Sequence, residues 1–150
     1  MTAENTHASL IHRFYEQCLN QYDSSILPEI FTPDAVAHSG TGDAHGLEAI
    51  RRTVDSVHAL FPEHRFTVED VVVNGEKGAA RWSMTAINSS PIAGVPPTGR
   101  PITNRAVVFY RFADQKIAEL WLQVDQVGVL RQIGVPLPGG PAVVPQPAHQ

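Results

Sequence analysis

The hydrophobic pattern of this chain changes its period once, at Pro62, and this change constrains the fold more than any other feature. Before Pro62, apolar residues recur every three or four positions, which is the spacing of amphipathic helices. After it, β-branched and aromatic residues gather in four extended runs, at about 64–73, 78–88, 102–112 and 116–125. Helices followed by consecutive strands predict an α+β domain, in which a strongly bent, mostly antiparallel sheet wraps around the helices. A cone of this kind leaves a cavity between its layers.

The region before Pro62 predicts three helices and one short strand. The strongest helix covers about residues 5–20, where apolar side chains form one continuous stripe. Asp23 resembles the N-cap of a short second helix that ends near residue 31. A short strand at 35–38 precedes a third helix at 46–61.

Turn and loop signals separate the four extended runs. Asn74-Gly75 and Asp114-Gln115 are candidates for tight turns, so we expect a meander of hairpins. The segment 90–101 is rich in Pro and Gly and predicts a loop at one end of the sheet. Residues 135–150 hold five prolines and two adjacent glycines. We therefore expect one domain over 1–134 and an extended or disordered tail over 135–150.

Composition excludes several classes of function. The net charge is -4 and the 11 Lys and Arg residues are scattered, which predicts no nucleic-acid partner. No apolar run approaches the ~20 residues of a membrane span, and the N-terminus lacks the pattern of a secretory signal. We expect a cytoplasmic protein with no membrane partner. The single Cys18 predicts a buried thiol on a helical stripe, with no internal disulfide.

The last predicted strand has two unlike faces, because successive side chains point to opposite sides. We expect its polar face to line the pocket, since an indole, an amide and a carboxylate in a row suit a binding site better than a core. A buried carboxylate can exchange a proton near neutral pH. We expect a second copy to cover the apolar face, which predicts a homodimer. The polar face carries Trp121, Gln123 and Asp125, and the apolar face carries Ala118, Leu120, Leu122 and Val124.

A series of short motifs follows the chain in a characteristic order and spacing. They are Arg13-Phe-Tyr15-Glu, Phe31-Thr-Pro-Asp-Ala-Val-Ala-His38, Gly46-Leu-Glu-Ala-Ile-Arg51, Phe61-Pro, Phe66-Thr-Val-Glu-Asp70, Arg81-Trp82, Gly94-Val-Pro-Pro-Thr-Gly-Arg100, Tyr110-Arg-Phe112, Lys116-Ile, Glu119-Leu-Trp121 and Asp125 followed by Gly128-Val-Leu-Arg-Gln-Ile-Gly134. Over about residues 10–134 the chain thus resembles the SnoaL-like polyketide cyclases. The resemblance implies the cone-shaped nuclear transport factor 2-like fold, with N-terminal helices packed on a strongly curved sheet.

The resemblance also implies a cofactor-free acid/base enzyme that acts on a hydrophobic, polyketide-like small molecule. Asp125 would remove a proton next to a carbonyl, and the enolate would close a ring by aldol attack. His38 would stand at the pocket mouth as proton partner or oxyanion donor. Read from the residues alone, Asp125 can instead cap a helix at 126–133, and His38 can be a half-exposed residue at a strand end. Relatives often carry Gly-Thr-His where this chain reads Ile87-Asn-Ser-Ser-Pro91, so its reaction can differ.

Further side chains are candidates for substrate binding because they combine aromatic or amide groups with inward-facing positions. For metal binding, His38 and His45 lack a third ligand, so no metal is predicted. The candidates for substrate binding are Tyr15, Trp82, Met84, Asn88, Asn104, Trp121 and Gln123.

Two other functions remain open at this stage. The same fold hosts hydrolases of small epoxides, in which two aspartates and an arginine activate water. The strand at 102–112 offers Arg105 and Arg111 but no carboxylate to pair with Asp125, which speaks against that chemistry. The other is a non-catalytic module that binds a small ligand or dimerises through the sheet.

Overall fold

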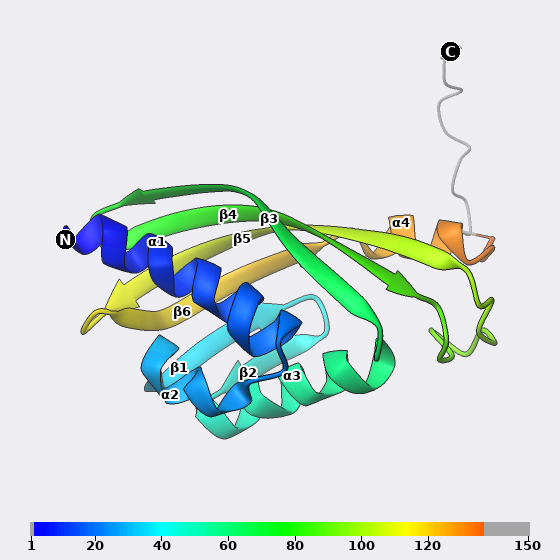
Figure 1. The fold of residues 1–150 in the computed structure, drawn as a ribbon, viewed down its shortest axis with the longest axis horizontal. Helices are drawn as coiled ribbons and strands as arrows, with labels where there is room; N and C mark the ends of the chain where they lie inside the picture. Colours follow the sequence, from blue (N-terminus) through cyan, green and yellow to red (C-terminus); the bar gives the residue numbers. More distant parts are fainter. Residues whose placement is uncertain (1, 137–150) are drawn as a thin grey trace, which may run out of the picture.

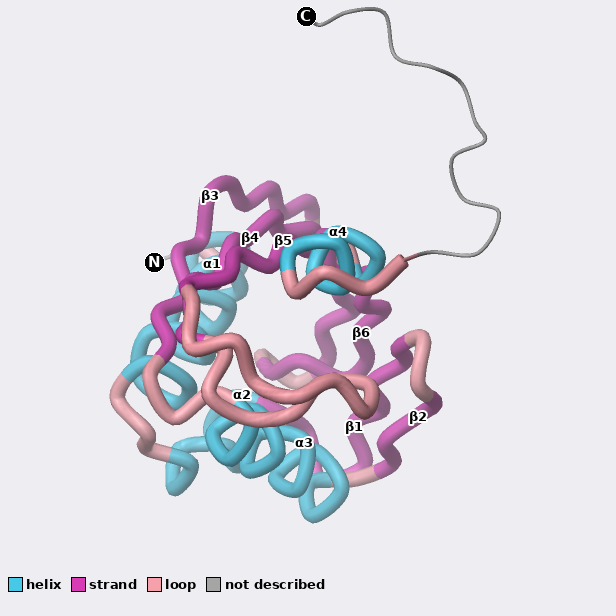
Figure 2. The backbone as a smooth tube through the Cα atoms, turned by 90° about the vertical axis from the view of Figure 1, so that its right-hand side faces the viewer, coloured by secondary structure: helices cyan, strands magenta, loops and turns pink. Residues whose placement is uncertain are grey.

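The protein is described by a computed structural model, which covers residues 2–136. A curved six-stranded sheet encloses the helices from one side, and α1 and α3 close the other side (Figures 1 and 2). The predicted α+β cone is confirmed. The predicted tail lies outside the described residues, apart from Val135 and Pro136.

The helices form where the apolar spacing predicts them. The first predicted helix is an α-helix whose last part continues as a π-helix, with side-chain capping by Thr2, whose hydroxyl accepts from the Asn5 amide at 3.0 Å. The helical elements are α1 (Ala3–Arg13), the π-helix η1 (Phe14–Asn20), the 3-10 turn η2 (Ser24–Ile26), α2 (Leu27–Ile30), α3 (Leu47–Leu60) and α4 (Gln126–Gln132).

The sheet has the order β2-β1-β6-β5-β4-β3. Its neighbouring strands pair antiparallel except for β1 and β6, which pair in parallel. The first of its hairpins was not predicted, because the segment that contains β2 is short and rich in Gly and polar residues. The strands are β1 (Phe31–Ser39), β2 (Gly42–His45), β3 (His64–Asn74), β4 (Lys77–Ile87), β5 (Pro101–Ala113) and β6 (Lys116–Val124).

Two tight turns connect β3 to β4 and β5 to β6. Asp114 and Gln115 have φ values of 53° and 61°, as the two central residues of a type I′ turn require. The other turn is shifted by one residue from the prediction. Asn74 pairs with Lys77, so Gly75 and Glu76 are its central residues, and Gly75 has the positive φ, 62°.

The two faces of β6 point the opposite way from the prediction. The apolar face of β6 is turned toward the helices, where Leu120, Leu122 and Val124 line a cavity and Ala118 is buried. Trp121, Gln123 and Asp125 are exposed on the outer, convex face of the sheet. The helical layer, and not a second copy, therefore covers the apolar face. The physical reason is that the side of a sheet that packs on helices is removed from water, which favours apolar side chains on that side.

Candidate functional site

An inner cavity of about 360 Å³ lies between the helices and the concave face of the sheet. Its wall is mostly apolar, and exposed residues of the β1–β2 hairpin line it at one point, which marks its mouth. A small number of polar groups in such a wall is the usual form of a small-molecule site. The apolar wall includes Phe14, Leu19, Phe31, Ile50, Val54, Phe61, Phe66, Met84, Val108, Leu120 and Leu122, and the polar side chains include Tyr15, His38, Asp43, Thr53, Trp82 and Asn104.

Two phenols and an indole form a buried group at the cavity: Tyr15 and Trp82 line it, and Tyr110 contacts Tyr15 without lining it. The hydroxyls of Tyr15 and Tyr110 lie 2.9 Å apart and form one hydrogen bond. Burial raises the pKa of Tyr15 to about 12, although the nearby Tyr110 hydroxyl and Trp82 indole oppose the shift. Burial also raises the pKa of Tyr110 well above its usual value. Both phenols therefore keep their protons at neutral pH and can donate hydrogen bonds.

Nε1 of Trp82 is buried and has no hydrogen-bond partner among the described residues. The indole lies near enough to Tyr15 to lower the pKa of that phenol slightly, but the geometry of the two groups is not that of a hydrogen bond. The indole N–H and the two phenols hold three donor hydrogens, and one of them is used within the group. A buried donor without a partner costs about 1–3 kcal/mol, so this wall favours a ligand that carries an acceptor oxygen.

The π-helix η1 brings Tyr15 into this position. In η1 the buried side chains are Tyr15, Cys18 and Leu19, and the aromatic ring of Tyr15 packs between Phe66 and Trp82 at centroid distances of 5.7 and 6.0 Å. π-Helical turns are rare and occur often at functional sites. Cys18 is fully buried, so the expected buried thiol is confirmed, and burial raises its pKa to about 12.

At the mouth, His38 lies between two carboxylates. Its Nδ1 is 3.0 Å from Asp43 Oδ1, and its Nε2 is 2.7 Å from Glu119 Oε2. The ring stacks on Trp121 at a centroid distance of 5.4 Å and an angle of 19°. Glu119 also accepts a hydrogen bond from Arg111 Nε at 3.1 Å. The family resemblance implied that His38 stands at the mouth, whereas its two partners, Asp43 and Glu119, were not predicted.

These contacts give the mouth a definite charge state. The hydrogen bond that His38 donates to Glu119, together with the contact with Asp43, raises the pKa of His38. The bonds from His38 and Arg111 lower the pKa of Glu119. The His38 charge is present at low pH and is lost as the pH rises through its raised pKa; the Glu119 charge is lost only as the pH falls through its lowered pKa. Between these two values both groups are charged.

Asp125 does not face the inner cavity. It is exposed beyond the end of β6, and its Oδ1 accepts a hydrogen bond from the Gly128 amide at 2.9 Å, which caps α4. The prediction that this carboxylate is held away from water in the hollow is wrong. The capping role, which the sequence left open beside the catalytic one, is the role that the geometry shows.

Replacing Asp125 with Ala is expected to lower the free energy of unfolding by about 1 kcal/mol, because the α4 amide loses its acceptor. Asn accepts the same bond, so the matched variant Asp125→Asn should unfold close to the wild type. Urea unfolding followed by circular dichroism measures both. Equal stability of the Ala variant and the wild type would contradict the capping role.

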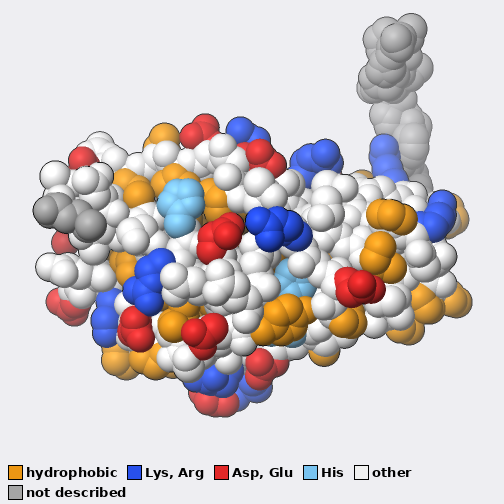
Figure 3. All heavy atoms as spheres, in the orientation of Figure 1, with side chains coloured by type: hydrophobic (Ala, Val, Ile, Leu, Met, Phe, Trp, Pro, Cys, Tyr) orange, Lys and Arg blue, Asp and Glu red, His pale blue; other side chains and the backbone are white. Residues whose placement is uncertain are grey.

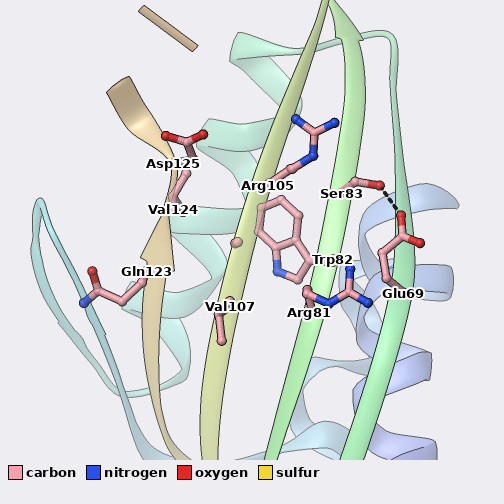
Figure 4. A pocket seen from close by; sticks show the side chains of 10 residues that line it. Glu69, Arg81, Trp82, Ser83, Arg105, Val107, Gln123, Val124 and Asp125 are labelled. Atoms are coloured by element: carbon pink, nitrogen blue, oxygen red, sulfur yellow. Dashed lines mark hydrogen bonds between the residues drawn. The ribbon is translucent and has the colours of Figure 1, made fainter. Parts of the chain in front are cut away.

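Asp125 and Gln123 instead line a second, open hollow of about 460 Å³ on the convex face. Figure 4 shows this hollow with Arg105 between Asp125 and Ser83, and with Glu69 hydrogen-bonded to Ser83. Both signs of charge alternate around it, as they do over the face seen in Figure 3. Trp121 lies farther along the same face, in contact with Phe109 and His38.

The remaining predicted residues divide between the cavity and the framework. Met84 and Asn104 line the inner cavity, as expected from their strand positions. Asn88 does not: it is 1% exposed, and its side chain bonds Ser90 and Thr98, which fixes the loop after β4. His45 ends the edge strand β2 and is exposed. Within residues 2–136 no group of three or more potential ligands could hold a metal ion.

Two observations bear on the alternatives. Among the described residues that line the inner cavity, Asp43 is the one carboxylate, whereas the epoxide-hydrolase arrangement needs two. No helix of the described part is long and apolar enough to cross a membrane.

The family model described as SnoaL-like polyketide cyclase matches residues 9–133. The structure of IdmH from Streptomyces antibioticus, a candidate polyketide cyclase, is similar with a TM-score of 0.77 and 36% identity, over 86% of this chain and 99% of that one. No curated protein matches significantly.

Two more distant structures share the fold. A candidate SnoaL-like polyketide cyclase from Jannaschia sp. CCS1 is 21% identical, with a TM-score of 0.81 over 91% of this chain and 97% of its own. AclR from Streptomyces galilaeus, a candidate hydroxylase, is 22% identical, with a TM-score of 0.76 over 87% and 86%. One fold thus carries different assigned chemistries, so function has to be argued from the site.

Proposed function

Because the chain belongs to the SnoaL-like polyketide cyclase family, we propose that it is a cofactor-free cyclase-type enzyme acting on an apolar carbonyl compound held in the inner cavity. The substrate carbonyl accepts hydrogen bonds from Tyr15 and Trp82, and a base removes the neighbouring proton. The enolate then attacks a second carbonyl of the same molecule, which forms a carbon–carbon bond and closes a ring. The proton taken by the base returns to the new alkoxide.

The excess of buried donors carries this proposal. An enolate oxygen is negatively charged, and preoriented donors in a site without water stabilise it more than they stabilise the neutral carbonyl. Trp82 Nε1 is buried, so a ligand oxygen reaches it only when the side chains around it shift. The donors at this wall are phenols and an indole, which remain neutral at the working pH.

Asp43 is the base in this proposal, in place of Asp125. Residue Asp43 borders the cavity at its mouth, but its carboxylate lies beside His38 on the side of the sheet that carries Trp121, so the proposal requires this exposed side chain to turn toward the mouth when a substrate binds. Asp125 does not line the cavity and caps α4. His38 Nδ1 lies 3.0 Å from Asp43 Oδ1, and as an imidazolium His38 can return a proton to the product.

Binding of a ketone and of its hydrocarbon analogue tests the donors. In Trp82→Phe an aromatic ring remains but the indole N–H is lost, so the affinity for 2-tetralone should fall about 2- to 10-fold more than the affinity for tetralin. Trp121→Phe is the matched control, because Trp121 lies outside the cavity. Calorimetric titration gives the dissociation constants. An equal loss for both ligands would mean that the indole supplies shape alone.

We also propose that the convex face forms a homodimer. Val72, Ala79, Phe109 and Trp121 pair in register from β3 to β6 and make one apolar row across the sheet. Phe109 is 45% exposed and Trp121 38%. Arginines and carboxylates on the same face, around the hollow of Figure 4, can pair with their copies across a two-fold axis.

A further inference from the structure

Four side chains form a row of ionic contacts across four adjacent strands. Asp43 on β2 contacts His38 on β1 at 3.0 Å, His38 contacts Glu119 on β6 at 2.7 Å, and Glu119 contacts Arg111 on β5 at 3.1 Å. Each carboxylate oxygen of Glu119 has a different partner: Oε2 meets His38 and Oε1 meets Arg111. Residues Asp43 and His38 border the cavity mouth, whereas Glu119 and Arg111 do not line the cavity.

The strand register explains why these side chains meet. His38 is the direct cross-strand partner of Asp43, and Arg111 is the direct partner of Glu119. Direct partners project to the same side of a sheet at short distance. His38 is paired with Trp121, two residues beyond Glu119, which puts the imidazole diagonal to that carboxylate and against the indole ring.

Both ring nitrogens of His38 face carboxylate oxygens, so both contacts are hydrogen bonds only when both nitrogens carry protons. A neutral imidazole has one N–H and would leave one carboxylate without its donor. The charged groups that face this ring are Asp43 from β2 and Glu119 from β6, with Arg111 from β5 behind Glu119. Trp121 adds an uncharged wall.

We propose that Glu119, oriented by Arg111, is the positioning residue for His38: from outside the cavity it holds the imidazole charged and turns Nδ1 toward Asp43. This inference rests on the proposed function, in which the Asp43–His38 pair moves the proton. Glu119 touches no cavity space, so it acts only through His38. The hydrogen bond that Glu119 accepts from His38 is also the largest cause of the raised pKa of His38.

The test is an NMR titration of His38 in the full chain, with the resonance assigned by its disappearance in His38→Gln. In Glu119→Gln the midpoint of the His38 titration should move to lower pH, because the amide carries no charge. Glu119→Asp keeps the charge and should restore part of the shift. Glu69→Gln, a glutamate on the same convex face that bonds Ser83 and not His38, should leave the midpoint unchanged.

A second measurement connects the titration with the reaction. The rate of hydrogen–deuterium exchange at the α-carbon of 2-tetralone should fall on the alkaline side of its pH profile. In Glu119→Gln this fall should occur at a lower pH than in the wild type, by the same number of pH units as the shift of the His38 midpoint. An unmoved His38 midpoint overturns the role of Glu119, even where Asp43 is needed for exchange. A moved midpoint with an unmoved exchange profile also overturns it. If Asp43→Asn exchanges as fast as the wild type, the proposed function itself is wrong.

Discussion

Asp43→Asn is expected to slow enzyme-catalysed α-proton exchange of 2-tetralone by about 10²- to 10⁴-fold, the usual contribution of a positioned general base. Asn has nearly the same shape as Asp but cannot accept a proton from carbon. Asp43 is exposed at the mouth of the cavity, so the change should leave the fold intact. Exchange in D₂O followed by proton NMR measures the rate without knowledge of the natural substrate.

Asp125→Asn is the matched control for this experiment. It makes the same chemical change in the carboxylate that the family resemblance implies as base, and Asn retains the cap of α4. The exchange rate of this variant should stay within about two-fold of the wild type, since the side chain does not line the inner cavity. Loss of exchange in Asp125→Asn together with retention in Asp43→Asn would reverse the assignment of the base.

The layer order of this fold can be predicted from local pattern because each layer has its own period. The stripe in residues 5–20 and the extended runs after Pro62 appear in the structure as α1 with η1 and as β3 to β6. These patterns report burial on one side of a single element, which needs no knowledge of distant contacts. The π-helical winding of η1 is not visible in the pattern, because Tyr15, Cys18 and Leu19 also suit an α-helical stripe.

The direction of each β6 face was predictable but was assigned wrongly. The alternation itself is correct: Leu120 and Leu122 share one side, and Trp121 and Gln123 share the other. A polar row was interpreted as a pocket wall, although an apolar row is what a layer of helices covers. The polar groups of the inner cavity come from other elements, among them Tyr15 on η1 and Trp82 on β4.

The row of ionic contacts at the mouth could not be predicted from the pattern of a single helix or strand, because it joins residues of four strands. His38 and Glu119 are 81 residues apart in sequence and meet through the parallel pairing of β1 with β6. Asp43 lies on β2, the strand that was not predicted. The signal that could have found it is the Ser39-Gly-Thr-Gly42 stretch directly after a strand, which is typical of a hairpin turn.

Phe109→Asp is expected to raise the dissociation constant of the proposed homodimer on the order of 10²-fold or more. Phe109 is the centre of the apolar row on the convex face, paired with Ala79 on one side and Trp121 on the other. A carboxylate at this point would be buried without a partner in the dimer, which costs about 3–5 kcal/mol. In the monomer the same side chain is exposed, so the variant should keep the wild-type circular dichroism.

Sedimentation over a range of protein concentrations measures this effect. Ala59→Asp is the control, because it adds the same charge at an exposed position of α3, in the helical layer on the other side of the molecule. It should sediment as the wild type does. A wild-type chain that is monomeric at every concentration would refute the homodimer, and equal association of Phe109→Asp and the wild type would place any dimer interface elsewhere. If dissociation occurs as expected, the inner cavities of both copies remain lined by residues of their own chains, since the apolar row lies on the opposite face of the sheet.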